Sequence, residues 1–219
     1  MKLKKINKFQ ISIDGGGSTG TSTGGKLISK KYGLSFLSSG LLYRYASYQI
    51  IKDKPKNEII FLKKIFKNLT LKKLNKIDLH TVEISKHTSI IAKVGNIRKI
   101  LKNFQINFAK NNKKCCIEGR DISTVILPKS ELKFFFKCDL DIAARRRYRE
   151  LKKKNNQIKF LEVKKALRIR NKLDIRRKNS PLLKHLDAIV IDTGKLGISS
   201  MMAKMSKEID KKIKIIYGS

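Results

Sequence analysis

The sequence predicts an α/β fold built around a central parallel sheet. A short apolar strand, residues 9–14, runs into a stretch of Gly, Ser and Thr, and a helical pattern follows it. Apolar strand-like segments then alternate with helical segments, as they do when helices connect parallel strands. The chain has 219 residues, 41% of them apolar, which is enough to bury one sizeable α/β core with a small inserted subdomain.

The first strand leads into a run of eleven residues, 15–25, that are only Gly, Ser or Thr. Apolar residues from Leu27 to Leu34 then recur near helical spacing. Glycines let backbone N–H groups converge on an anion, and a helix N-terminus adds its dipole, so this order predicts a phosphate-binding loop. Gly15, Gly20 and Ser22 match the motif G-x-x-x-x-G-K-[ST], but Thr21 stands in place of its lysine.

The next segments continue the alternation up to an irregular region. Residues 34–40 predict a short strand that ends in a turn, and a helix follows to about Ile51. Between 52 and 83, Lys-rich breaks separate short apolar pieces that predict strands of a small antiparallel insert; these pieces are residues 59–62, 69–71 and 77–79. Two helices follow, at 84–92 and 97–108, separated by Gly95 and Asn96 as a stop and a cap.

The second half of the chain begins with a short strand, residues 115–117, that ends in a charged turn at 118–121. Because ligands sit at the carboxyl ends of strands in doubly wound sheets, this Gly-Arg-Asp turn is well placed to meet an anion. Residues 124–128 and 132–136 give a buried-strand pattern, and the phenylalanines of the latter are core candidates.

Two basic helices follow, from residue 141 and from about 160 to 177, with Asn155 and Asn156 between them. Their arginines predict either a mobile lid over phosphates or a solvated charged face, since guanidinium groups present forked donors and stay charged. A buried strand at 188–192 and an amphipathic helix at 196–212 complete the predicted fold.

The composition is strongly basic, with 52 Lys and Arg against 17 Asp and Glu and a net charge of +35. Such an excess fits a polyanionic partner such as nucleic acid, or a genome-wide bias, because Lys, Asn and Ile are all abundant. The basic residues are spread along the chain without an Arg-Gly or aromatic-interleaved run. We therefore favour the compositional explanation and expect no specific nucleic-acid partner.

Three cysteines without a CxxC spacing indicate neither a metal site nor a disulfide framework, which is typical of a reducing compartment. The first eight residues are too polar for a signal peptide, and no run approaches the roughly 18 apolar residues of a membrane span. We expect a soluble cytoplasmic protein with no membrane partner.

Five blocks in order carry a resemblance to a known family. They are 13–15 at the loop, 37–44 (LSSGLLYR), 85–92 with Ile97-Arg98, 119–121 (GRD) with Thr124-Val125, and 170–177 (RNKLDIRR) with 180–182 (SPL). With these blocks the chain resembles bacterial cytidylate kinases, of the nucleoside monophosphate kinase group of P-loop proteins, over nearly its whole length.

The resemblance implies transfer of the γ-phosphoryl group of ATP to CMP or dCMP with Mg²⁺, by a monomeric enzyme. It also implies a three-layer P-loop fold with a central parallel sheet, formed by a single domain over residues 1–219. The implied parts are a core (1–51, 109–140 and 180–219), a nucleotide-monophosphate-binding insert (about 52–108) and a helical lid (about 141–160, with its helix running to 178).

The resemblance also assigns roles to individual residues. It implies that the ATP phosphates are bound by Gly15, Gly16, Gly17, Ser18, Thr19, Gly20, Thr21, Ser22 and Thr23, with the Ser22 hydroxyl as a ligand of Mg²⁺. It implies catalytic roles for Arg170 and for the lid arginines Arg146 and Arg147. The implied substrate-binding residues are Ser39, Arg44, Ser89, Arg98, Arg120, Asp121, Arg170, Asp174 and Arg177. Taken without the resemblance, Asp174 could simply pair with Arg170 one helical turn away.

Four positions depart from the family pattern. Thr21 replaces the loop lysine, Gly16 a frequent proline, Ala143 a frequent lid arginine, and Ser123 a glycine. The loop lysine normally follows charge into the transition state, so one hypothesis is an active enzyme in which the positive field or a lid arginine partly replaces it. The alternative is a nucleotide-binding homologue with weak or no catalysis, and a third is a basic nucleic-acid-binding protein. The intact acceptor-side blocks favour the enzyme.

Overall fold

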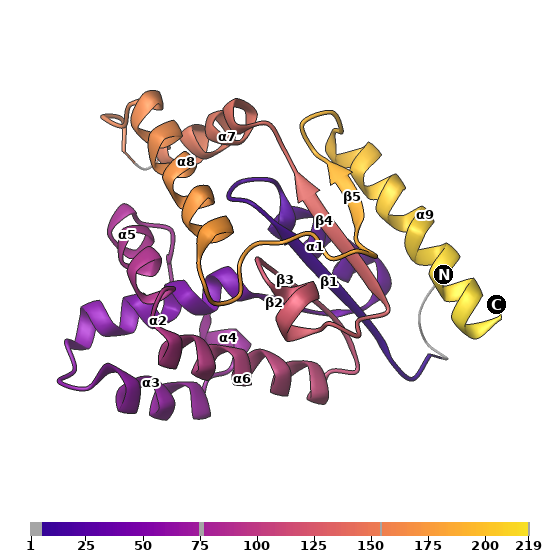
Figure 1. Cartoon of the computed structure of the whole chain (residues 1–219), viewed down its shortest axis with the longest axis horizontal. Coiled ribbons are helices and arrows are strands. Elements are labelled where there is room, and N and C mark those ends of the chain that lie inside the picture. Colours follow the sequence, from indigo (N-terminus) through magenta and orange to yellow (C-terminus); the bar gives the residue numbers. More distant parts are fainter. Residues whose placement is uncertain (1–5, 75–76, 154, 219) are drawn as a thin grey trace. The chain divides into compact units, whose positions relative to one another are not determined.

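The computed structural model describes residues 6–74, 77–153 and 155–218, apart from the side chain of Lys72. It confirms the α/β class, with a five-stranded sheet in the order β2-β3-β1-β4-β5 (Figure 1). The neighbours β1–β3, β1–β4 and β4–β5 run parallel. The strands are β1 Phe9–Gly15, β2 Ser35–Ser38, β3 Lys114–Gly119, β4 Leu132–Lys137 and β5 Ile189–Asp192.

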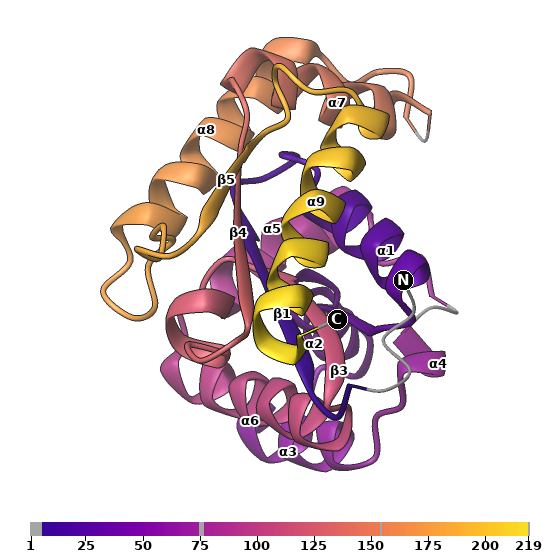
Figure 2. The same ribbon diagram turned by 90° about the vertical axis from the view of Figure 1, so that its right-hand side faces the viewer.

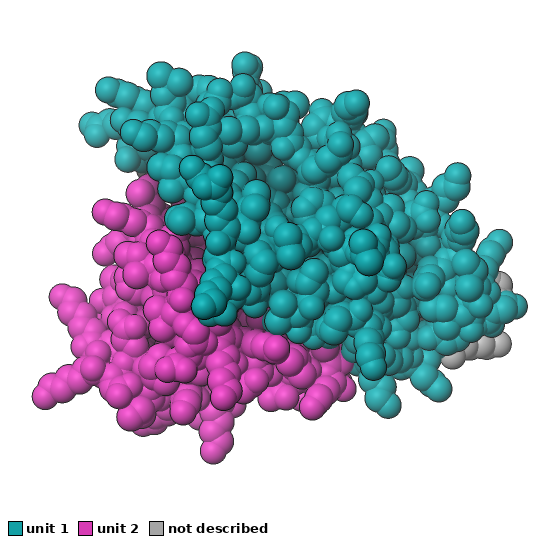
Figure 3. Space-filling model, in the orientation of Figure 1, with its two compact units in different colours: residues 1–36, 113–219 teal, residues 37–112 magenta. Residues whose placement is uncertain are grey.

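Helices make up the rest of the regular structure in the described residues. They are α1 Thr21–Tyr32, α2 Ser39–Asp53, α3 Glu58–Lys67, α4 Leu71–Leu74, α5 Val82–Ile91, α6 Gly95–Asn111, the π-helical turn η1 Ile122–Ile126, α7 Leu140–Lys152, α8 Phe160–Arg176 and α9 Ile198–Tyr217. The chain divides into two compact units, coloured in Figure 3. Unit 1 holds residues 1–36 and 113–219, and unit 2 holds residues 37–112.

The core of unit 1 lies between the sheet and the helices α1 and α9 (Figure 2). Every residue of β1 is buried, as expected for a central strand covered on both faces. The methionines and isoleucines of α9 recur every four residues and turn one apolar stripe toward that core. The stripe is formed by Met201, Met205, Ile209 and Ile213. This packing fixes β1, and with it the start of the glycine-rich loop.

The predicted short strands between residues 52 and 83 are wrong. Residues 59–62 lie in α3, residues 69–71 lead into α4, and residues 77–79 form no regular element. The side chain of Asn57 caps α3 by accepting hydrogen bonds from the N–H groups of Ile59 and Ile60. The buried Leu62 and Phe66 lie four residues apart, which is a helical period and not the alternation of a strand.

Two further boundaries differ from the prediction. Residues 122–126 form η1, so only 132–137 of the predicted buried-strand region belong to the sheet. Helix α1 begins at Thr21, so the second half of the Gly/Ser/Thr run is helical. Its glycines are needed for packing, because a Cβ at Gly24 would lie 2.7 Å from the Phe136 ring and one at Gly25 2.6 Å from the Phe36 ring.

The predicted pair of basic helices is present as α7 and α8, which pack against each other through small and apolar side chains. Ala143 and Ala144 are buried against Leu167, so the position where the family often has arginine belongs here to the hairpin's own core. The rings of Tyr148 and Phe160 close the hairpin edge to face, 5.9 Å apart. Among the described residues, no helix combines the length and apolarity needed to cross a membrane.

Candidate active site

The glycine-rich loop joins β1 to α1 and exposes backbone donors. Ser18 and Gly20 have positive φ values of 58° and 93°, which turn the chain back toward the helix. Gly20 is the N-cap of α1 and offers no side-chain acceptor, and the first turn carries no acidic residue. The first-turn N–H groups and the positive end of the helix dipole are therefore available to an anion.

The side chain of Thr21, in the lysine position of the motif, bonds to a carboxylate. Its hydroxyl donates to Glu118 Oε2 at 2.8 Å, and the hydroxyl of Ser22 donates to Glu118 Oε1 at 2.9 Å. Glu118 is buried near the carboxyl end of β3. The motifs in the sequence assign no role to Glu118, although an acidic residue directly before the Gly-Arg-Asp turn is a usable signal. Thr21 thus has a well-defined partner but brings no positive charge to the loop.

Helix α8 lies against the loop. Asn171 Oδ1 accepts a hydrogen bond from the N–H of Gly17 at 2.9 Å. A Cβ at Gly17 would lie 2.5 Å from Leu167 Cδ1, so α8 approaches the backbone closely there. Asn171 was not among the predicted site residues, because it lies inside a matched block but at none of the positions that define the block. One backbone N–H of the loop that could bind a phosphate is therefore already hydrogen-bonded to a side-chain amide.

An arginine of α7 is linked to the loop through one threonine. The guanidinium of Arg146 donates to Thr193 Oγ1 at 3.1 Å and to the Thr193 carbonyl at 2.7 Å. The Thr193 hydroxyl in turn donates to the carbonyl of Thr19 in the loop at 2.7 Å. Thr193 therefore bridges the permanently charged guanidinium of Arg146, on α7, and the backbone of the loop.

Arginines gather around Arg170 on α8. Burial, and then the charge of Arg120, lower the pKa of the Arg170 guanidinium to about 10, and Arg147 acts in the same direction. Asp174 and Glu118 oppose this shift but do not cancel it. Like charges that destabilise one another in the free protein are relieved when an anion binds among them. Arg147 also forms an ion pair with Glu150 at 3.0 Å.

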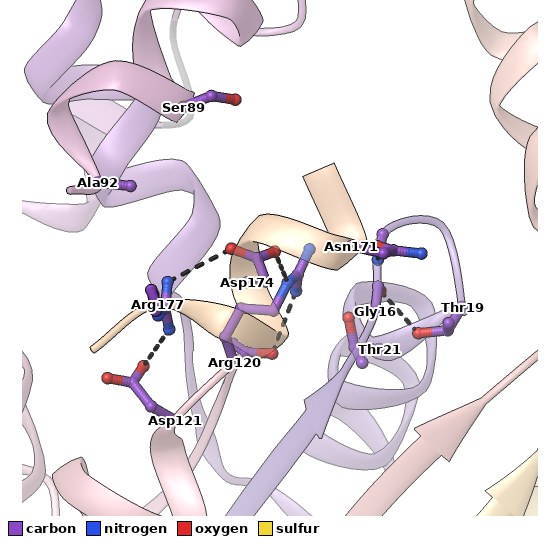
Figure 4. A network of polar contacts seen from close by, with 12 residues as sticks. Gly16, Thr19, Thr21, Ser89, Ala92, Arg120, Asp121, Asn171, Asp174 and Arg177 are labelled. Carbon is purple, nitrogen blue, oxygen red and sulfur yellow. Dashed lines mark hydrogen bonds and ion pairs between the residues drawn. The ribbon is translucent and has the colours of Figure 1, made fainter. Parts of the chain in front are cut away.

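The acidic and basic residues of two matched blocks form one network (Figure 4). Arg120 Nε lies 3.0 Å from Asp174 Oδ2, and Arg177 lies 3.4 Å from the other carboxylate oxygen. Arg177 also approaches Asp121 at 3.9 Å and donates to the carbonyl of Ser180. Asp174 therefore bridges Arg120 and Arg177, and the local pair with Arg170 that the sequence left open is not the contact that forms.

Asp14, at the end of β1, ties the loop strand to η1. It accepts hydrogen bonds from the N–H groups of Ile122 and Ser123, both at 2.7 Å, and from the Ser123 hydroxyl at 2.5 Å. Burial raises the pKa of the Asp14 carboxyl to about 6, although these hydrogen bonds act in the opposite direction. Ser123, one of the departures from the family pattern, thus supplies a donor that a glycine could not.

The remaining predicted residues lie in unit 2, where each has an internal contact. Arg44 is buried on α2 and donates to the Leu79 carbonyl at 3.1 Å and to the Ser85 hydroxyl at 2.8 Å. Arg98 donates to the Ala92 carbonyl at 3.4 Å and stacks over the ring of Tyr43. Ser39 begins α2 and is buried, and the Ser89 hydroxyl donates to the Ser85 carbonyl at 3.2 Å.

Within unit 1 the structure brings together the loop, the Asp174 network and the arginines of α7 and α8. The described residues contain no cluster of three or more His, Cys, Asp or Glu side chains that could hold a metal ion by themselves. A metal ion at this site would therefore depend on ligands from a bound phosphate as well as on the hydroxyl of Ser22 and the carboxylate of Glu118.

The strand order, the glycine-rich loop and the surrounding arginines define a P-loop phosphotransferase of the nucleotide kinase type. The sequence model of the family described as "Cytidylate kinase" matches residues 11–211. The cytidylate kinase of Rickettsia africae is 34% identical over 206 residues, covering 94% of this chain and 93% of that protein. The cytidylate kinase of Rickettsia akari is 32% identical over 209 residues, with the same coverage. The chain belongs to the cytidylate kinase family.

Solved structures agree on the fold. An uncharacterized protein from Eubacterium ventriosum aligns with a TM-score of 0.54 at 15% identity, covering 94% of this chain and 99% of that one. Shikimate kinase from Bacteroides thetaiotaomicron aligns with a TM-score of 0.50 at 10% identity, covering 94% and 98%. At such identities the likeness concerns the fold alone.

Proposed function

We propose that this chain transfers the γ-phosphoryl group of ATP to CMP or dCMP, giving ADP and CDP or dCDP. The observation that carries the proposal is the match to the cytidylate kinase family over residues 11–211, in a chain where the charges of Arg120 and Arg147 act on Arg170. Phosphoryl transfer depends mainly on positioning and on neutralising the charge of the transferred group. The arginines around Arg170 supply positive charge, and the uncapped N–H groups of α1 supply donors for a phosphate.

On the donor side, the loop residues 15–23 bind the ATP phosphates through backbone N–H groups. The N–H groups of the first turn of α1 and the helix dipole favour this binding, because Gly20 leaves them uncapped by any side chain. Asn171 must release the N–H of Gly17 for that donor to reach a phosphate. The loop therefore binds ATP in competition with a contact of the protein itself.

Mg²⁺ accompanies ATP in this proposal, and the residues present fit it. Ser22 and Glu118 offer oxygen atoms, the ligands that Mg²⁺ prefers, with waters and phosphate oxygens completing the shell. When bound, Mg²⁺ neutralises negative charge on the phosphates. The hydrogen bond to Glu118 fixes the position of the Ser22 hydroxyl at the start of α1.

On the acceptor side, we assign phosphate and sugar binding to Arg44, Arg120, Arg170 and Arg177. Asp174 accepts hydrogen bonds from ribose hydroxyls, and Arg120 and Arg177 hold its carboxylate in position. Ser89, Arg98 and Asp121 read the cytosine ring, and Ser39 contributes at the start of α2. We further propose that residues 52–108 act as the monophosphate-binding insert, that the α7–α8 hairpin acts as the lid, and that the protein works in the cytoplasm.

Arg146 takes over part of the role that a loop lysine plays. Thr193 links the Arg146 guanidinium to the loop. The two hydrogen bonds to Thr193 do not neutralise the guanidinium charge, because both acceptors are uncharged. Arginine residues that stabilise the transferring phosphoryl group are worth about 10³–10⁵ in kcat. The replacement of lysine by Thr21 is therefore compatible with turnover.

A coupled assay of ADP release on the purified chain tests the proposal, with CMP, dCMP, UMP and AMP as acceptors. We expect turnover with Mg²⁺ and ATP, fastest with CMP or dCMP. Absence of turnover with all four acceptors, from a folded protein that still binds ATP, would leave a nucleotide-binding homologue and contradict the proposed activity.

A further inference from the structure

Unit 2 contains a cavity of about 970 Å³ between α3 and α6, which lie side by side (Figure 1). Its apolar floor includes Phe66 and Phe104, whose rings meet edge to face with their centroids 5.7 Å apart. Phe66 is buried and Phe104 half-buried, so the floor is fixed by packing but still reachable. Its volume falls at the upper end of the range of small-molecule sites, about 300–1,000 Å³.

The walls of the cavity carry amides and positive charges. Five asparagines line it, and three of them, Asn103, Asn107 and Asn111, follow each other at four-residue spacing along one face of α6; the other two are Asn96 and Asn112. Lys63, Lys67 and Lys99 are the lining cations, and no lining residue is acidic. Among the described residues none of these three lysines forms an ion pair, so their charges remain available to an anion.

The cavity is separate from the acceptor residues proposed in the same unit. Arg98 lies on another face of α6, over the ring of Tyr43 from α2, and Arg44 is bonded to Leu79 and Ser85. Neither these two arginines nor Ser39 and Ser89 line the cavity. The proposed activity therefore leaves this group of lysines, amides and aromatic rings without a role.

We propose that this cavity is a second nucleotide site, which binds a nucleoside polyphosphate as an effector. The three ammonium groups match a chain of phosphates, since charge complementarity favours a polyanion. The asparagine side chains offer both donors and acceptors to the edge of a base. The aromatic rings of Phe66 and Phe104 offer a stacking surface to the face of the base.

The test is the binding stoichiometry of the full chain, measured by calorimetry with ATP, CTP and inorganic tripolyphosphate. We expect two nucleotide sites per chain, and weaker binding of tripolyphosphate than of either nucleotide at the second one. The double variant Lys63→Ala/Lys67→Ala should weaken the second site at least tenfold and leave the first unchanged. Both lysines are exposed, so the variant should fold. Lys110→Ala, an exposed lysine of α6 outside the cavity, is the matched control.

Photo-crosslinking with an azido-nucleotide locates the site independently, and labelled peptides from residues 58–67 or 95–111 are expected. One site per chain, a double variant that binds like the parent, or equal affinity for tripolyphosphate and nucleotides would each overturn the proposal. So would a short single-stranded RNA that displaces nucleotide from this site more effectively than ATP does. Turnover with CMP is a separate readout, and its absence would contradict the proposed activity without affecting the stoichiometry.

Discussion

The phosphate loop and the arginine network both belong to unit 1, but they satisfy their polar groups differently. In the loop, hydroxyls and N–H groups bond to Glu118 and to the Asn171 amide, and no cation of the loop takes part. In the network, charged pairs link Arg120, Asp174 and Arg177. Two of the four departures from the family pattern, Gly16 and Thr21, lie in the loop, and Ser123 of η1 bonds to Asp14 at the end of β1. Thr21 also has a good partner, Glu118. Compared with the family pattern, the loop therefore lacks the lysine charge at position 21, but several of its polar groups are still hydrogen-bonded.

The largest expected effect comes from removing Arg146, the cation that Thr193 links to the loop. Arg146→Ala should lower kcat about 10³-fold, because an arginine on the transferring phosphoryl group contributes at least that much. Arg149→Ala, an exposed arginine of the same helix, should leave kcat within about twofold and serves as the control. Steady-state kinetics with ATP and CMP measure both, and equal effects of the two substitutions would contradict a specific role for Arg146.

The pH dependence of stability tests the role of the buried Asp14 carboxyl, which ties β1 to η1. Its pKa is raised to about 6 in the folded protein, so the folded state binds the proton more tightly than the unfolded state does. The stability that Asp14 contributes is therefore largest at acidic pH and falls as the pH rises from about 4 to about 6, by up to about 3 kcal/mol.

Asp14→Asn cannot titrate, so the difference in free energy of unfolding between the parent and this variant isolates the effect. Urea unfolding at several pH values between 4 and 7 should show this difference shrinking as the pH rises. A difference in free energy of unfolding that stays constant over that window would show that burial does not raise the pKa of the Asp14 carboxyl.

Substitution of Asp174 tests whether the charged network binds the acceptor nucleotide. Asp174→Asn removes the charge that holds Arg120 and Arg177, and we expect the KM for CMP to rise about tenfold with a smaller change in the KM for ATP. Asp187→Asn replaces an exposed carboxylate and is the control. If the KM for ATP rose more than the KM for CMP, the assignment of this network to the acceptor would be wrong.

The smallest effect is expected at Asn171. Asn171→Ala frees the N–H of Gly17 and removes a contact that ATP must break, so ATP should bind about fivefold more tightly, in line with one hydrogen bond of about 1 kcal/mol. Asn156→Ala, in the turn between α7 and α8, is the matched control. Equilibrium binding of ATP measures both, and weaker binding by Asn171→Ala would mean that the amide contacts the bound phosphates instead.

The sequence predicted the parallel α/β sheet because its strands are short, apolar and bounded by clear turns. It failed between residues 52 and 83, where Lys-rich surfaces on α3 mask the four-residue spacing of Leu62 and Phe66. It noted Ala143 only as a departure from a frequent arginine, and the packing of Ala143 against Leu167 in the core of the hairpin could not be read from that pattern.

At the site, motifs identified the loop and the arginines but not their partners. Glu118, Asn171 and Thr193 act through contacts between residues that are 97, 154 and 174 positions apart in the chain. No local pattern encodes such contacts, since they depend on how β3, α8 and the end of β5 pack around the loop. The roles of the individual site residues remain predictions.

The most direct test of the account combines Thr21→Lys and Arg146→Ala, with kcat measured for the parent, both single variants and the double variant. If Arg146 supplies the charge missing from the loop, Thr21→Lys alone should raise kcat less than tenfold. In the Arg146→Ala background the same Thr21→Lys substitution should raise kcat about 100-fold, which would show strong coupling between the two positions. If Arg146→Ala instead lowers kcat by the same factor with Thr or Lys at position 21, Arg146 does not replace the loop lysine.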